Sequence, residues 1–179
     1  MKTKNILRLA LATACVLLVP LAAMQFTDEV VWTPSDFVVA GVLLFGAGLT
    51  YELVAKRTGN TAYRVAVGLA VATSLILVWM NLAVGIIGSE DNPANVMYVG
   101  VLAVGIVGAI VARLQPHGMA RALYATALAQ MLVPVIAVII WRPPFTAGVL
   151  GVFVLNGIFV ALFVSSALMF QRASATSPR

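Results

Sequence analysis

Charged side chains are scarce in this sequence. Only 9% of its 179 residues are Asp, Glu, Lys or Arg, whereas 62% are hydrophobic. Soluble domains usually carry about 25% charged residues. So few charges cannot cover a surface in water, so lipid must be the solvent over most of the chain. The length suits a single transmembrane domain, residues 1–179, with no separate soluble domain.

Cysteine and histidine are almost absent. Cys15 and His117 stand alone, which excludes a disulfide within the chain, a Cys/His metal site and a haem held by two histidines. No Ser/His/Asp set can be assembled, and no Gly-rich phosphate loop precedes a lysine. We therefore expect no catalytic residues, no metal, no cofactor and no enzymatic activity.

The net charge of +5 does not indicate a nucleic-acid partner. The basic residues form no basic domain with aromatic platforms, which nucleic-acid binding favours. They lie between apolar segments instead, as the residues that orient membrane proteins do.

Six segments are long and apolar enough to cross a bilayer, which takes about 20 residues. No linker between them exceeds about ten residues, so neighbouring segments should pack antiparallel. The predicted fold is an all-α membrane protein, a compact six-helix up-and-down bundle. The predicted spans are Ile6–Gln25, Ser35–Lys56, Ala62–Ile87, Ala94–Leu114, Met119–Ile140 and Thr146–Gln171.

The first span also has features of a signal peptide, because basic residues precede an apolar run. Ala12-Thr13-Ala14-Cys15 faintly resembles a lipoprotein cleavage site. However, the chain stays apolar after Cys15, over Val16–Ala23, so a retained helix is the preferred interpretation.

The basic residues predict the orientation. If the N-terminus is cytoplasmic, only Arg142 of the eleven basic residues is outside, and both termini are cytoplasmic. The other ten are Lys2, Lys4, Arg8, Lys56, Arg57, Arg64, Arg113, Arg121, Arg172 and Arg179. Aromatic residues agree, with Trp32, Trp79, Trp141 and Tyr98 toward the outside and Tyr51, Tyr63 and Tyr124 toward the inside.

Glu52 is the most informative single residue. It shares one helical face with Gly41, Phe45 and Gly48, and glycine stripes mark close helix packing in membranes. An ionisable group there is a candidate proton or cation site. The alternative is an interfacial acid paired with Lys56 at i+4, or with an arginine from a neighbouring helix, Arg113 or Arg121.

Uncharged polar residues form a second candidate group, Asn81, Gln130 and Asn156. Thr126 shares a face with Gln130, and Pro134 one turn later frees a backbone carbonyl. These side chains need partners in a dry bundle, so they either line a small polar cavity or hydrogen-bond between helices.

A third candidate is an acidic rim on the outer side. Its members are Asp28, Glu29, Asp36, Glu90 and Asp91. Carboxylates of this kind can hold Ca²⁺, but the spacing lacks the alternation of an EF-hand loop. Helix capping, solvation and pairing with Arg142 explain them as well.

The stretch Gly85-Ile86-Ile87-Gly88-Ser89-Glu90-Asp91-Asn92-Pro93-Ala94-Asn95, together with Ala22–Glu29, resembles an uncharacterised family of small bacterial inner-membrane proteins. The resemblance implies a multi-pass protein of the bacterial inner membrane and brings no activity with it.

Two functional hypotheses follow. The first is a non-enzymatic protein that acts by association, as an accessory subunit or a homo-oligomer, with membrane lipids around it. Its tightest contacts should involve the small residues Gly41, Gly48, Gly105, Gly108 and Ala112. The second is a small transporter or channel for a small polar solute, proton or cation, using Glu52 and the Asn81/Gln130/Asn156 group.

Overall fold

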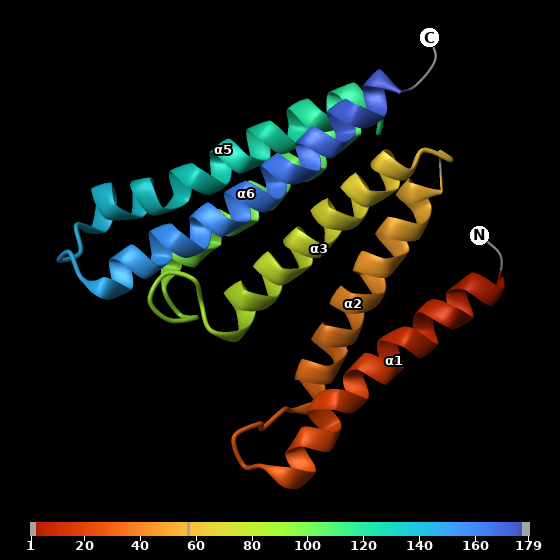
Figure 1. Cartoon of the computed structure of the whole chain (residues 1–179). Helices are drawn as coiled ribbons and strands as arrows, with labels where there is room; N and C mark the ends of the chain where they lie inside the picture. Colours follow the sequence, from red (N-terminus) through yellow and green to blue (C-terminus); the bar gives the residue numbers. More distant parts are fainter. Residues whose placement is uncertain (1–2, 57, 177–179) are drawn as a thin grey trace. The chain divides into compact units, whose positions relative to one another are not determined.

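A computed structural model describes residues 3–56 and 58–176 (Figure 1). In these two ranges the chain forms six α-helices and one short 3₁₀ helix, and no strand. The helices are α1 (Thr3–Phe26), α2 (Pro34–Ala55), α3 (Thr61–Ala83), η1 (Pro93–Val96), α4 (Met97–Val111), α5 (Pro116–Trp141) and α6 (Ala147–Ala175).

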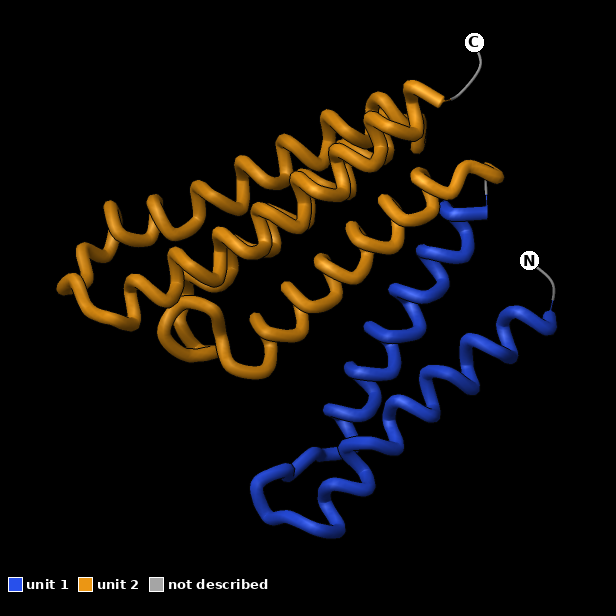
Figure 2. Tube along the Cα trace, in the orientation of Figure 1, with its two compact units in different colours: residues 1–57 blue, residues 58–179 orange. Residues whose placement is uncertain are grey.

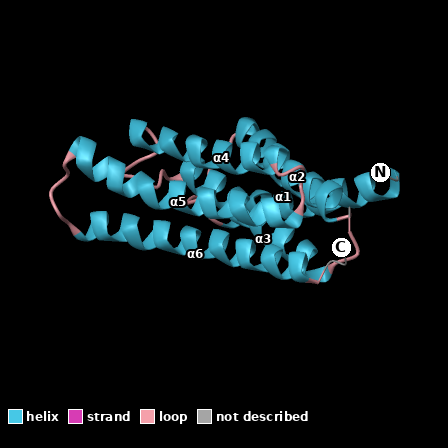
Figure 3. Ribbon diagram, turned by 90° about the horizontal axis from the view of Figure 1, so that it is seen from above, coloured by secondary structure: helices cyan, strands magenta, loops and turns pink. Residues whose placement is uncertain are grey.

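Long helices dominate the described chain, and loops are confined to their ends (Figure 3). Six helical segments in the described residues are long and apolar enough to cross a membrane, with η1 and α4 counted as one. Many large apolar side chains on them are exposed, Val99 and Ile106 on α4 for example. This surface is compatible with lipid and not with water. The predicted all-α, six-span membrane protein is confirmed.

The chain divides into two compact units (Figure 2), residues 1–57 and residues 58–179. The prediction that all six helices form one domain stays a prediction. The first unit is the hairpin α1–α2. Its helices approach closely because Gly48 lies against the side chain of Leu9, where a Cβ would collide, and Gly41 lies against Leu17.

The second unit is a four-helix bundle in which α6 contacts both α5 and α3, while α4 packs mainly against α5. Within this unit α3 therefore has α6, and not α4, as its main partner, so the expectation that neighbouring segments pack together is wrong for α3 and α4. The aromatic rings of Tyr63 and Phe170 join α3 to α6 with their centroids 5.0 Å apart, edge to face. Fully buried Phe159 and Phe163 continue the same face of α6.

Small residues set the spacing of α4 and α5. A Cβ on Gly108 would lie 2.6 Å from the Cβ of Ala122, and one on Gly105 would lie 3.2 Å from the hydroxyl oxygen of Thr126. A Cβ on Gly118 would lie 2.7 Å from that of Ala112. The predicted close contacts are confirmed for Gly48, Gly105, Gly108 and Ala112, whereas Gly41 makes an ordinary van der Waals contact with Leu17.

The helix ends differ from the predicted ones at several places. The third helix ends at Ala83, four residues before the predicted Ile87, because the chain turns there and Gly85 has φ of 68°. The fourth ends at Val111 in a Schellman motif, in which Arg113 N donates to Ile110 O and Leu114 N donates to Ala109 O. The fifth begins three residues early, at Pro116, where a first-turn proline is favourable.

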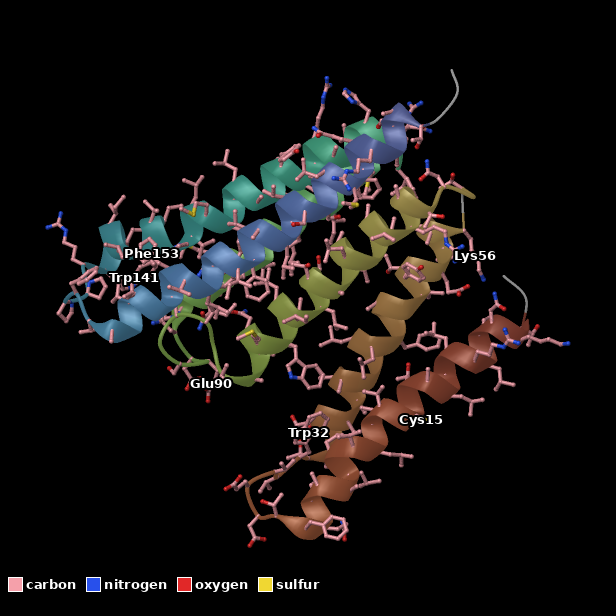
Figure 4. The ribbon with its side chains drawn as sticks, in the orientation of Figure 1. Cys15, Trp32, Lys56, Glu90, Trp141 and Phe153 are labelled. Carbon is pink, nitrogen blue, oxygen red and sulfur yellow. The ribbon has the colours of Figure 1, made fainter. Side chains whose placement is uncertain are left out.

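Most basic residues lie at one end of each unit and most acidic residues at the other, with Glu52 of α2 and Arg142 after α5 as exceptions. In the hairpin, Lys56 follows α2 at one end and Trp32 precedes α2 at the other (Figure 4). In the four-helix unit, Asn60 donates to the carbonyl of Ala173, which brings the start of α3 beside the end of α6. Glu90 lies in the connection at the far end (Figure 4). Lys2, Arg57 and Arg179 lie outside the described residues.

Candidate functional site

A buried polar cluster joins three helices of the four-helix unit. The Nδ2 of Asn156 on α6 donates to the hydroxyl oxygen of Tyr98 on α4 at 3.0 Å and to the carbonyl of Val152 at 2.8 Å. Its Oδ1 accepts from Gln130 Nε2 on α5 at 2.9 Å and from the Tyr98 hydroxyl at 3.2 Å. Asn156 therefore uses its donors and its acceptor together, and it connects α4, α5 and α6.

Burial makes this cluster expensive to disrupt. Gln130 and Asn156 are both 0% exposed, and Tyr98 is 1% exposed. Polar groups in such a place require partners, since neither water nor lipid can supply them. Hydrogen bonding between helices, one of the two alternatives for these residues, accounts for the side chain of Asn156 and for Nε2 of Gln130.

One acceptor of the cluster lacks a partner. Gln130 Oε1 is buried and makes no hydrogen bond within residues 3–56 and 58–176. One turn further along α5, Pro134 has no N–H to offer to the backbone carbonyl of Gln130. Thr126, on the same face, donates to Ala122 O at 2.9 Å, and in the described residues it makes no hydrogen bond to the cluster. The amide of Gln130 is thus the least satisfied part of this site.

Asn95 organises the connection between α3 and α4. Its Oδ1 accepts from the backbone N–H groups of Ile86 at 3.2 Å and Ile87 at 2.9 Å. Its Nδ2 donates to the carbonyls of Ile87 and Ser89, at 3.4 Å and 2.7 Å. Asn81 donates to the carbonyl of Asn95 at 3.4 Å, while its own Oδ1 is buried and unpaired in the described chain. Asn81 therefore belongs to this connection.

Glu52 lies at the basic end of the hairpin α1–α2. It forms an ion pair with Lys56 on the next turn of α2, and its Oε2 accepts from Asn5 Nδ2 on α1 at 3.3 Å. The side chain of Glu52 is 29% exposed and that of Lys56 is 50% exposed. The i+4 pairing proposed as an alternative is present, and the face shared with Gly41 and Gly48 does point toward α1.

Among the acids of the predicted outer rim, the structure shows a local role for the side chain of Asp36. Asp36 and Thr33 form a capping box at the start of α2, with Thr33 N donating to Asp36 Oδ2 at 2.6 Å. Glu29 N donates to Thr27 Oγ1 at 3.1 Å. Asp28, Glu90 and Asp91 are exposed. In the residues that the structure describes, no three Asp, Glu, His or Cys side chains gather as metal ligands would.

Three participants were not found from the sequence. Tyr98 was read as an interfacial aromatic, yet it is buried against Asn156, 58 positions away. The sequence assigns no individual role to Asn95, which holds the connection between α3 and α4. Asn5, which contacts Glu52 across 47 positions, was not considered. Only the three-dimensional arrangement of the helices reveals these pairs.

The comparisons with known proteins add no relative. No family model, no curated protein and no solved structure matches the chain. The expected resemblance to an uncharacterised family of bacterial inner-membrane proteins stays a prediction, and functional argument rests on this chain's own residues.

Proposed function

We propose that this chain is a non-enzymatic, multi-pass protein of the bacterial inner membrane that acts by association, as an accessory subunit or a homo-oligomer. One observation carries the proposal. Gly100 on α4 and Gly151 on α6 are exposed, and no atom lies within 4 Å of a Cβ placed on either.

Glycine inside a helix is unfavourable by about 1 kcal/mol relative to alanine unless close packing requires it. Packing within the four-helix unit explains Gly105 and Gly108, but it does not explain Gly100 or Gly151. In membranes, small residues on a helix surface let a second backbone approach. Close approach of another helix at one of these two faces would explain why glycine stands there.

The distribution of charged residues supports an orientation of the chain in the membrane. Basic residues at one end of each unit favour that end as the cytoplasmic one. The lack of a catalytic set in the sequence supports a role without chemistry.

The test is native mass spectrometry of the gently solubilised protein. We expect a homo-oligomer or a co-purifying membrane protein. The variants Gly100→Leu and Gly151→Leu add a bulky side chain to two different faces, and one of them should abolish the complex. Ala125→Leu, on an exposed position of α5, is the matched control and should retain it. A monomer with nothing attached would refute the proposal.

A transporter or channel for a small polar solute, proton or cation is the second candidate. It is favoured by the two buried amide oxygens without partners, Asn81 Oδ1 and Gln130 Oε1, which are ready acceptors. Proteoliposomes containing a pH-sensitive dye test the proton, and the same liposomes containing a cation-sensitive dye test a cation. Transport should raise the rate of entry of one of them, and Gln130→Leu should remove the increase. Equal rates in protein-free liposomes and proteoliposomes with both dyes would refute proton and cation transport.

A further inference from the structure

The hairpin α1–α2 has an open hollow at its basic end. Its volume is about 440 Å³, and it is lined by Asn5, Arg8 and Leu9 of α1 and by Glu52 and Lys56 at the end of α2. Typical ligand sites have volumes of about 300–1,000 Å³. The hollow is therefore large enough for a small ligand or a headgroup.

Packing of the two helices creates this hollow. The contact between Leu9 and Gly48 brings α1 and α2 together one turn deeper in the hairpin. Asn5 lies one turn before Leu9, and Glu52 lies one turn after Gly48, so they meet where the two helices end. Arg8 is on the same part of α1, three residues after Asn5.

The charges in the hollow are unequal. Two cations, Arg8 and Lys56, face one carboxylate. That carboxylate already has two partners, Lys56 and Asn5, both at Oε2. Arg8 has no hydrogen bond or ion pair with any residue in the ranges 3–56 and 58–176. The hollow thus holds one positive charge in excess, on a side chain whose donors are unused.

We propose that this hollow binds a phosphate-bearing anion, with Arg8 as its principal ligand and Lys56 as the second. A guanidinium presents paired N–H donors that match two oxygens of a phosphate group. Lys56 is exposed and Glu52 is partly exposed, so solvent screens and weakens their ion pair and Lys56 can turn toward an anion. The proposal does not depend on the association proposed above.

The position of the hollow suits a lipid headgroup. It lies at the start of one apolar helix and the end of the next, where basic side chains reach lipid phosphates. Free phosphate offers the same chemistry, so the experiment has to separate the two sources.

Replacing Glu52 should change the affinity for anions in a direction that a purely structural role of this residue would not produce. Its negative charge opposes an anion in the hollow and occupies Lys56. Glu52→Gln should therefore tighten anion binding. If Glu52 were instead a ligand for a cation, the same substitution would leave anion binding unchanged.

The experiment titrates the full-length protein in detergent and measures bound species by native mass spectrometry. The probes are phosphatidylglycerol, phosphatidylcholine and inorganic phosphate. Arg8→Gln should weaken anion binding about fivefold, the factor expected for one basic residue near a phosphate surface. Glu52→Gln should strengthen it severalfold. Arg121→Gln, which removes an exposed arginine of α5 outside the hollow, is the control and should bind as the wild type does.

The outcomes distinguish the sources. Binding of phosphatidylglycerol that inorganic phosphate does not displace identifies a lipid site, and binding of inorganic phosphate alone identifies a soluble anion. Both support the proposal if Arg8→Gln weakens binding. Equal effects of Arg8→Gln and Arg121→Gln would overturn it, as would unchanged or weaker anion binding by Glu52→Gln. The gain expected from Glu52→Gln cannot arise from misfolding.

Discussion

At the scale of single residues, Asn156 is the most consequential side chain of the four-helix unit. Replacing Asn156 with leucine removes two donors and an acceptor from a buried site, and it leaves the Tyr98 hydroxyl and Gln130 Nε2 without this partner. We expect a loss of about 1–3 kcal/mol in the free energy of unfolding. Denaturation in mixed micelles, followed by circular dichroism, measures it.

Gln130→Leu is the informative companion of that variant. It removes one hydrogen bond but also one unpaired buried oxygen, so the two effects oppose each other. The free energy of unfolding should change by less than about 1 kcal/mol. Losses of equal size in the two variants would show that Asn156 is not the centre of the cluster.

Asn95 controls the connection between α3 and α4 in the same manner. Asn95→Ala leaves the N–H groups of Ile86 and Ile87 and the carbonyl of Ser89 without their side-chain partner. We expect faster hydrogen exchange of these amides and faster proteolysis in the connection. Glu90→Gln, at an exposed position, should leave both rates unchanged. Unchanged exchange in Asn95→Ala would mean that the connection is held by other contacts.

The sequence was sufficient to single out Glu52, Asn81, Gln130 and Asn156, because polar groups in apolar helices need partners. It did not identify most of the partners. Tyr98 meets Asn156, and Asn5 meets Glu52, only after helices distant in sequence have packed. A partner at i+4 on the same helix can be predicted from the sequence, as Lys56 is for Glu52. A partner on another helix depends on which helices become neighbours.

At the scale of helices, glycine positions separate internal packing from exposed surface. In Gly108→Ala the new Cβ would lie 2.6 Å from the Cβ of Ala122 and 3.2 Å from its Cα, so α4 and α5 must separate. The expected loss is about 1–3 kcal/mol. Gly100→Ala meets no atom within 4 Å and should stabilise the monomer by up to about 1 kcal/mol, through helix propensity alone.

The same denaturation assay, performed in micelles at low protein concentration, measures both variants. Destabilisation by Gly100→Ala would mean that its face is covered within the monomer. No change in Gly108→Ala would show that α4 and α5 can move apart without loss.

The length and hydropathy of the apolar runs predicted six helices, and the outcome agrees because both are local properties of the chain. Helix ends were predicted less well. The early end of α3 depends on Asn95 binding the backbone N–H groups of Ile86 and Ile87, which lie nine and eight residues earlier in the chain. The partnership of α3 with α6 was not visible either, since both α4 and α6 offer apolar faces.

At the scale of the whole molecule, the distribution of charge predicts orientation in the membrane. Ten of the eleven basic residues fall on the connections and ends assigned to the cytoplasm, and only Arg142 falls on the other side. A fluorescent protein fused after Arg179 should therefore fluoresce, and alkaline phosphatase fused there should be inactive. Alkaline phosphatase inserted at Glu90 should be active, because that connection lies at the opposite end of the four-helix unit.

Because the bias of basic residues toward the cytoplasmic side is large, the loss of a single basic residue should not change the orientation. Removing one basic residue leaves nine against one, so Arg172→Gln should give the same reporter signals as the wild type. Arg142→Gln removes the single opposing charge and should also leave the orientation unchanged. Active phosphatase at both Glu90 and the C-terminus would contradict an odd number of spans between them, and with it the arrangement of α4, α5 and α6 as three crossings. The reporters therefore test the orientation and the count of helices in one measurement.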